Sequence, residues 1–379
     1  MTRRRWLRLA VGSVVAAGVV ALALRSGPAL VLSLALALPA SEAWFSPILA
    51  DVVREDVVIV SGDRRIPADL YRPVSPRAAL VVVHGLSRAG RRHPEIVRLA
   101  RSISRHRQLV LVPELDGLVR FALTGTEVDD LRAALRHLRT SGAPVGIAGF
   151  SFGAGPALLA AAEAPDVRVV GSFGGYADLT NVIAFVTTGA HGFGGQRYAQ
   201  RQEEYNRWKL LALLAGVLER GPDRGPLAVI AERRLANPAD DTRELEARLG
   251  ADGQAVLRLV LNRDEAAVSG LVTALSPATR QALARLSPLG SVHRLTGRLL
   301  IAHGAGDESI PFTESLRLAA AARGRARLAI LHGFHHTGPQ TVWRSLLEHT
   351  ADSWNLMRLV DGLLEVPRRY RPDPPNRAT

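Results

Sequence analysis

Two kinds of hydrophobic pattern alternate along the body of the chain. Short runs of consecutive apolar residues, such as 79–83, are typical of strands buried on both faces of a parallel sheet. Such runs recur at 109–113, 145–148, 167–172, 298–303 and 327–331. Between them, apolar residues recur at helical spacing over 95–105, 128–139, 154–164 and 313–322. This alternation predicts an α/β fold with a doubly wound, mostly parallel sheet.

The pattern departs from this alternation at two places. Before the series, 57–60 and 66–71 flank the turn residues Gly62 and Asp63, which predicts an antiparallel hairpin. From 182 to 290 the pattern is helical and rich in Arg and Glu, with only a weak strand pattern at 227–231. Because the strand series then resumes, we interpret this segment as a helical cap inserted into the core.

The N-terminal segment has the pattern of a membrane anchor. Three arginines at 3–5 precede an apolar run at 9–24, and a second run covers 29–40. A single span would leave the arginines in the cytoplasm and the body on the outer, periplasmic side of a bacterial inner membrane. The second run is too short to favour a hairpin of two spans, and whether the segment is cleaved stays open. The alternative is a buried N-terminal helix.

These patterns divide the chain of 379 residues, which is long enough to bury a large core. The predicted parts are a signal anchor or transmembrane segment (1–45), the first part of the core (46–181), the cap (182–290), the second part of the core (291–366) and a disordered, Pro-rich tail (367–379).

Composition excludes several classes of chemistry. The chain has no cysteine, which rules out disulfides, thiolate metal sites and cysteine nucleophiles. The net charge of +13 raises the question of nucleic-acid binding. However, only one of the 48 basic residues is a lysine, Lys209, and the arginines are scattered without interleaved aromatics. We therefore attribute the charge to codon usage and expect no nucleic-acid partner.

The most informative segment is the pentapeptide at 149–153. It has the form G-x-S-x-G, with Ser151 at its centre, and it lies between a buried strand run and an Ala-rich helical pattern. A serine on such a strand-to-helix turn projects its hydroxyl above the sheet edge, and the flanking glycines let neighbouring backbone approach. The helix that follows directs its free N–H groups toward the same point. We therefore predict that Ser151 is a nucleophile.

Two later loops supply the partners that a serine nucleophile needs. A base must take the hydroxyl proton, and an acid must orient that base. One buried strand run ends in a Gly-rich loop that carries Asp307, and the next ends in a loop that carries His335 and His336. Because carboxyl ends of parallel strands meet at one edge of the sheet, we expect these side chains to lie beside Ser151.

These motifs resemble those of the α/β-hydrolase superfamily, and within it the branch of dienelactone hydrolases and acyl-peptidase-like esterases. The resemblance covers roughly 52–364 and identifies Ser151 with the nucleophile of that family. The family's acid loop, G-x-x-D-x-x-[IV]-P, is matched around Asp307 at every fixed position. Its histidine loop, G-x-x-H, selects His336 over His335. The resemblance implies a Ser-Asp-His triad.

The family's H-G-x loop is matched at 84–86. The resemblance implies that the backbone N–H groups of Leu86 and Phe152 form an oxyanion hole. Substrate-binding side chains are not identified by any motif in the cap.

The remaining histidines and acids have alternative roles. His84 is expected to position its loop rather than to transfer protons. His303 and His332 end buried strand runs and are expected to be hydrogen-bonded core residues. Asp178, which follows another strand run, is the rival of Asp307 for the acid position, because some relatives carry their acid there.

The resemblance implies a serine hydrolase that cleaves a carboxylic ester through an acyl-enzyme, without metal or cofactor. Thioesters and amides are alternative substrates, and the expected partner is a small acyl ester. An acyltransferase, a peptidase or a non-catalytic binding protein of the same fold are the rival hypotheses. The sequence leaves the substrate and the oligomeric state open.

Overall fold

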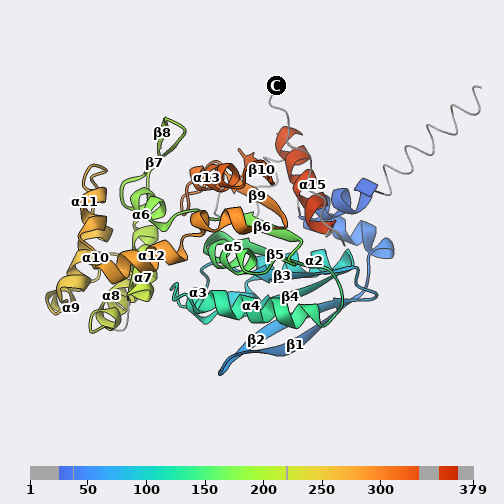
Figure 1. Ribbon diagram of the computed structural model, residues 1–379, viewed down its shortest axis with the longest axis horizontal. Coiled ribbons are helices and arrows are strands. Elements are labelled where there is room, and N and C mark those ends of the chain that lie inside the picture. The colour runs from blue at the N-terminus through green and yellow to red at the C-terminus, as the bar shows by residue number, and fades with distance from the viewer. Residues whose placement is uncertain (1–24, 37, 219–220, 333–349, 366–379) are drawn as a thin grey trace, which may run out of the picture.

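The computed structural model describes residues 25–36, 38–218, 221–332 and 350–365. Its centre is an eight-stranded sheet with the order β1-β2-β4-β3-β5-β6-β9-β10 (Figure 1). The strands are β1 (Val52–Ser61), β2 (Arg64–Pro73), β3 (Ala78–Val83), β4 (Gln108–Pro113), β5 (Val145–Phe150), β6 (Val169–Phe173), β9 (Arg298–Gly304) and β10 (Ala326–Leu331). β1 pairs antiparallel with β2, and β2 with β4. All other neighbours are parallel, so the predicted hairpin and the mostly parallel sheet are confirmed.

The hydrophobic pattern of each strand follows from its place in the sheet. Every residue of β3 and β4 is buried, because helices cover both faces. Successive side chains of β3 point to opposite faces: Val81 and Val83 join one core cluster, and Leu80 and Val82 join another. In β1, by contrast, burial alternates along the strand.

Helices cover the two faces of the sheet. The first cluster holds residues of α4 (Thr126–Arg139), α5 (Ala154–Ala162) and α13 (Thr313–Ala321). The second holds residues of α2 (Pro94–Arg105) and α15 (Thr350–Leu364). A four-residue helix, α3 (Asp116–Val119), follows β4.

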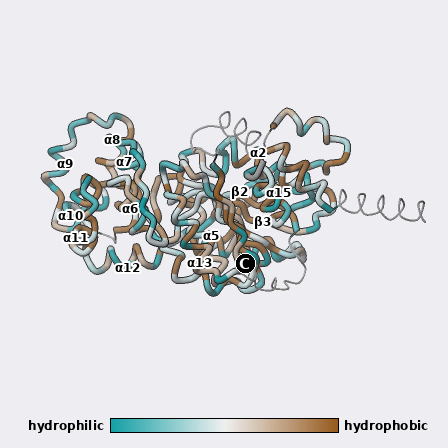
Figure 2. Tube along the Cα trace, turned by 90° about the horizontal axis from the view of Figure 1, so that it is seen from above, coloured by the Kyte–Doolittle hydropathy of each residue, from teal (hydrophilic) through white to brown (hydrophobic). Residues whose placement is uncertain are grey.

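A long helical segment lies between β6 and β9. Figures 1 and 2 show it as a lobe beside the core. It comprises α6 (Leu179–Thr188), β7 (Ala190–Phe193), β8 (Gln196–Ala199), α7 (Glu204–Val217), α8 (Arg224–Ala236), α9 (Arg243–Ala247), α10 (Ala251–Leu261), α11 (Val268–Thr273) and α12 (Pro277–Leu286). The antiparallel hairpin β7–β8 departs from the expected all-helical pattern, and 227–231 belongs to a helix, not a strand.

The second apolar run near the N-terminus packs on the core. Residues 25–36 are helical, and Ala29 and Leu32 are buried in the same cluster as Leu359 of α15. No helix within the described residues is long and apolar enough to cross a bilayer. The three arginines and the first apolar run, at 1–24, lie outside the described residues, as does the predicted tail.

Candidate active site

Ser151 occupies a strained turn between β5 and α5. It directly follows β5, begins the 3-10 turn Ser151–Gly153, and has φ +51°, a value that non-glycine residues rarely adopt. The turn is tightly enclosed, because a Cβ on Gly153 would lie 2.1 Å from the carbonyl oxygen of His84. Ser151 is nevertheless partly exposed. The predicted strand–turn–helix context of the serine is therefore confirmed.

The loop after β3 lies against this serine. A Cβ on Gly85 would be 2.9 Å from the Cβ of Ser151, so the two backbones are in close contact. Among the described residues, no hydrogen bond engages the N–H of Leu86, the next residue. Phe152 stands second in the 3-10 turn, where N–H groups have no partner within the turn. Phe152 thus directly follows Ser151 in the chain, and Leu86 follows the glycine that contacts Ser151.

His84 fixes this loop. Its ring is fully buried, its Nδ1 donates to the carbonyl oxygen of Gly85 at 2.8 Å, and its Nε2 accepts the N–H of Leu115 at 3.2 Å. A carbonyl can only accept and an N–H can only donate, so these partners require the neutral ring. Burial also lowers the pKa of His84. His84 has the positioning role expected from the sequence.

Asp307 is buried in the loop after β9, with 3% of its surface exposed. Its Oδ1 accepts the backbone N–H groups of Ser309 at 2.8 Å and Ile310 at 3.0 Å. These bonds fix the carboxylate, and Oδ2 lies 3.6 Å from Nε2 of His303. β6 pairs with both β5 and β9, so the acid loop and the serine turn follow strands that are two places apart at one sheet edge.

The rival acid, Asp178, has a structural partner. Its carboxylate accepts the N–H of Thr180 at 2.8 Å and caps the N-terminus of α6. Its own N–H, with that of Ala177, donates to the buried carboxylate of Glu314 at 2.7 and 2.9 Å. Burial raises the pKa of Glu314, which the sequence analysis did not single out. Asp178 therefore has a structural role at the start of α6.

The histidine loop cannot be placed, because His335 and His336 lie outside the described residues. His303 is a buried core residue, as expected, with its Nδ1 2.7 Å from Oγ of Ser315. The same expectation is wrong for His332, whose side chain is 70% exposed. The reason is its position: β10 is the edge strand of the sheet, so its end is not covered on both sides.

The strand order, the serine turn after β5 and the acid loop after β9 are together the arrangement expected from the resemblance. The chain has an α/β-hydrolase fold. No model of a known protein family and no curated protein matches the sequence.

Solved structures of hydrolases are similar to this fold. An esterase domain from Rhodothermus marinus is 16% identical, with a TM-score of 0.45 over 80% of this chain and 98% of that one. An acylaminoacyl peptidase from Pyrococcus horikoshii is 14% identical, with a TM-score of 0.48 over 81% of this chain and 42% of that one. A 2,6-dihydroxy-pseudo-oxynicotine hydrolase is 15% identical, with a TM-score of 0.48 over 89% of this chain and 74% of that one.

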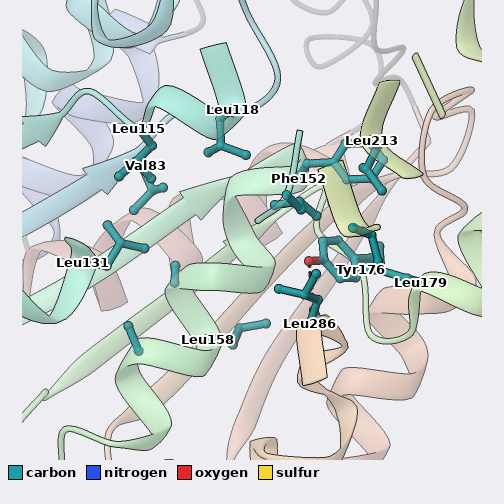
Figure 3. Close-up of a cluster of buried hydrophobic side chains, with 14 of the residues drawn as sticks. Val83, Leu115, Leu118, Leu131, Phe152, Leu158, Tyr176, Leu179, Leu213 and Leu286 are labelled. Atoms are coloured by element: carbon teal, nitrogen blue, oxygen red, sulfur yellow. Dashed lines mark hydrogen bonds between the residues drawn. The ribbon is translucent and has the colours of Figure 1, made fainter. Parts of the chain in front are cut away.

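The segment 182–290 forms hydrogen bonds with the loops that follow β6 and β9. On α7, Asn206 donates from Nδ2 to the carbonyl oxygen of Glu308 at 2.9 Å, next to Asp307. At the other end of the cap, Tyr176, which follows β6, donates to the carbonyl oxygen of Leu286 at 3.0 Å. Figure 3 shows Tyr176 and Leu286 with Phe152 in one buried cluster. This segment is therefore packed against residues next to Asp307 and Ser151.

A charge network around the buried Asp69 contacts the far end of the loop after β3. Arg91 donates from its backbone N–H to Glu114 at 2.8 Å and from its guanidinium to Asp56 at 2.9 Å and to Asp69. Asp69 is fully buried, and burial raises its pKa while Arg91 and Arg54 oppose that shift. The only sequence signal for this network was a charged residue within the apolar alternation of β2.

Within the described ranges, no group of three or more His, Asp or Glu is arranged to hold a metal ion.

Proposed function

We propose that this protein is a serine hydrolase that cleaves a carboxylic ester, with Ser151 as the nucleophile. The observation that carries the proposal is the strained φ of Ser151 on a turn against which the Gly85 backbone is packed. A serine in the interior of an ordinary helix or loop has no need of such strain, which is characteristic of functional sites. The buried, doubly hydrogen-bonded Asp307 at the same sheet edge supports it.

The proposed reaction uses the residues that the sequence identifies. His336 accepts the hydroxyl proton of Ser151 while Oγ attacks the ester carbonyl carbon, and Asp307 orients the imidazole. The N–H groups of Leu86 and Phe152 stabilise the oxyanion, each by about 3 kcal/mol. The C–O bond to the alcohol breaks, and the alcohol leaves with the proton from His336. Water, deprotonated by the same histidine, then releases the acid and regenerates the serine.

Hydrolysis of p-nitrophenyl esters by full-length protein tests the proposal. We expect Ser151→Ala and His336→Ala each to lower kcat by about a thousandfold or more, and His335→Ala to change it by less than about tenfold. Asp307→Asn should lower kcat strongly, because the imidazole loses its orienting acceptor. Full activity in Ser151→Ala would show that the reaction occurs elsewhere. Parallel panels of thioesters and anilides separate the alternative substrate classes.

We also propose that the N-terminal segment anchors the protein in a bilayer, with the body on the outer side of the inner membrane. The arginines at 3–5 followed by the apolar run at 9–24 support this placement. Because the helix at 25–36 packs on the core, such an anchor would hold the body close to the membrane surface. Protein that resists alkaline extraction and is digested by protease in spheroplasts supports the proposal, whereas release at neutral pH after lysis contradicts it.

A further inference from the structure

One face of the cap helix α7 rests on the core. Asn206, Lys209, Leu213 and Gly216 are spaced by three or four residues and therefore share a face. The first of these contacts the acid loop, because Asn206 donates to Glu308 and its Oδ1 accepts from Oγ of Ser309 at 3.4 Å.

The other end of this face approaches the serine turn. Leu213 belongs to the same buried cluster as Phe152, the residue after the nucleophile, as Figure 3 shows. A Cβ on Gly216 would lie 2.6 Å from the Cβ of Ala122, so the helix lies directly on the core there. Lys209 stands between these contacts. Its position on the helix places it between the acid loop and the nucleophile turn.

The ammonium group of Lys209 lies over an aromatic ring of the same helix. Its Nζ is 5.3 Å from the centre of the Tyr205 ring, which is itself partly exposed to solvent. Burial lowers the pKa of Lys209, and the negative charge of Asp307 opposes that shift. Burial removes part of the hydration of an ammonium, and an incoming anion offsets that loss.

The residue type is informative as well. Lys209 is the single lysine among 48 basic residues, in a chain that uses arginine everywhere else. An ammonium is a compact point charge on a flexible stem, whereas a guanidinium is a rigid planar fork that favours bidentate pairing. The negative charge of Asp307 acts on this position, and a planar fork there would compete for its carboxylate. A lysine supplies positive charge to a ligand with less of that competition.

We propose that Lys209 binds a carboxylate of the substrate, so that this hydrolase acts on esters that carry a free carboxylate. The inference rests on the proposed function, because it names the substrate class of the same site. Specificity would then come from the cap, whereas the chemistry comes from the core.

Matched pairs of esters test this inference. In the first set, the p-nitrophenyl half-ester of succinate, glutarate or adipate is compared with the corresponding methyl-capped diester. In the second set, 4-acetoxybenzoate is compared with its methyl ester, so that the carboxylate lies on the alcohol part of the acetate ester. We expect wild type to prefer the anionic member of at least one pair by about tenfold or more in kcat/KM. Lys209→Met should abolish the preference and Lys209→Arg should retain part of it. Arg248→Met, which removes an exposed cap cation paired with Glu244, is the control and should leave it unchanged.

A binding measurement independent of turnover uses the single lysine. Protein labelled with ¹³Cε-lysine, carrying Ser151→Ala to prevent turnover, gives one side-chain NMR signal. We expect this signal to shift saturably on addition of glutarate or 4-hydroxybenzoate, and not on addition of the corresponding methyl esters. An unmoved signal with every carboxylate overturns the inference.

The outcomes separate this inference from the proposed function. Equal losses on anionic and neutral esters in Lys209→Met mean that the lysine acts through Asp307, which overturns the inference and leaves the hydrolase intact. If wild type hydrolyses esters without any preference for the anionic ones, the inference is likewise overturned and the proposed hydrolase function stands. Failure of wild type to turn over any ester, with no covalent labelling of Ser151, removes both.

Discussion

The closest packing at the proposed site predicts the effect of adding one methyl group. In Gly153→Ala, the new Cβ would lie 2.1 Å from the carbonyl oxygen and 3.0 Å from the carbonyl carbon of His84, and 3.1 Å from Cγ1 of Val83. Relaxing the carbon–oxygen contact to normal separation requires a shift of about 1 Å. The nearest atoms are backbone, and the ring of His84 is held by Gly85 and Leu115, so no flexible side chain can yield. The shift must move the H-G-x loop or Ser151.

The magnitude follows from this displacement. A misplacement of about 1 Å at a catalytic constellation lowers the rate by about a hundredfold. Overpacking of this kind costs about 1–3 kcal/mol of unfolding free energy, which leaves a folded protein. We therefore expect Gly153→Ala to lower kcat/KM for p-nitrophenyl butyrate about a hundredfold while the protein still unfolds cooperatively in urea.

The control is the same substitution where a methyl group meets nothing. A Cβ on Gly270, in helix α11, has no atom within 4 Å. Gly270→Ala should leave kcat/KM unchanged and stabilise the protein by up to about 1 kcal/mol. If the kcat/KM of Gly153→Ala stays within threefold of wild type, the H-G-x loop and the Ser151 turn have room for an added methyl group, and the argument is refuted.

Three further predictions concern the supports of the site. Arg207, a buried residue of α7, donates to three carbonyl oxygens at the ends of α6 and α10. In urea unfolding, Arg207→Leu should therefore lower the unfolding free energy by about 3 kcal/mol or more. A loss below about 1 kcal/mol contradicts this prediction. Tyr176→Phe removes the bond to Leu286 and should cost about 1–2 kcal/mol in the same assay, with no change contradicting the bond. Burial lowers the pKa of His191 to about 4. The unfolded chain, with a pKa near 6.5, therefore binds the proton first, and stability falls as pH drops from about 6.5 to 4. His191→Phe keeps the stacking on Tyr198 and should make Tm fall less steeply as pH drops over this range, whereas an unchanged slope rejects the assignment.

The fold was predictable wherever burial on both faces produced consecutive apolar residues. β3 and β5 are of this kind, and so the α/β alternation and the turn that carries Ser151 were visible in the sequence. The apolar run at 227–231 misled because its buried residues, Leu227, Ile230 and Ala231, are spaced as on a helix, and the intervening residues are not buried.

Other features had a weak signal or none. The hairpin β7–β8 has strands of only four residues, and its signal was the pair Gly194–Gly195, both at positive φ, which is typical of a tight two-residue turn. The contacts of Asp69 with Arg91 and of Asn206 with the acid loop join segments far apart in the chain. Such contacts depend on tertiary packing, which no local pattern encodes.

Covalent labelling of Ser151 tests the central claim most directly. Full-length protein is incubated with a fluorophosphonate, digested, and the modified peptide is sequenced by mass spectrometry, with Ser151→Ala treated in parallel. The proposed function predicts one adduct, on Ser151, that is absent from Ser151→Ala and is prevented by heat denaturation before labelling. An adduct on another serine, or none on folded protein that binds small esters, would contradict the claim that Ser151 is the nucleophile of a hydrolase.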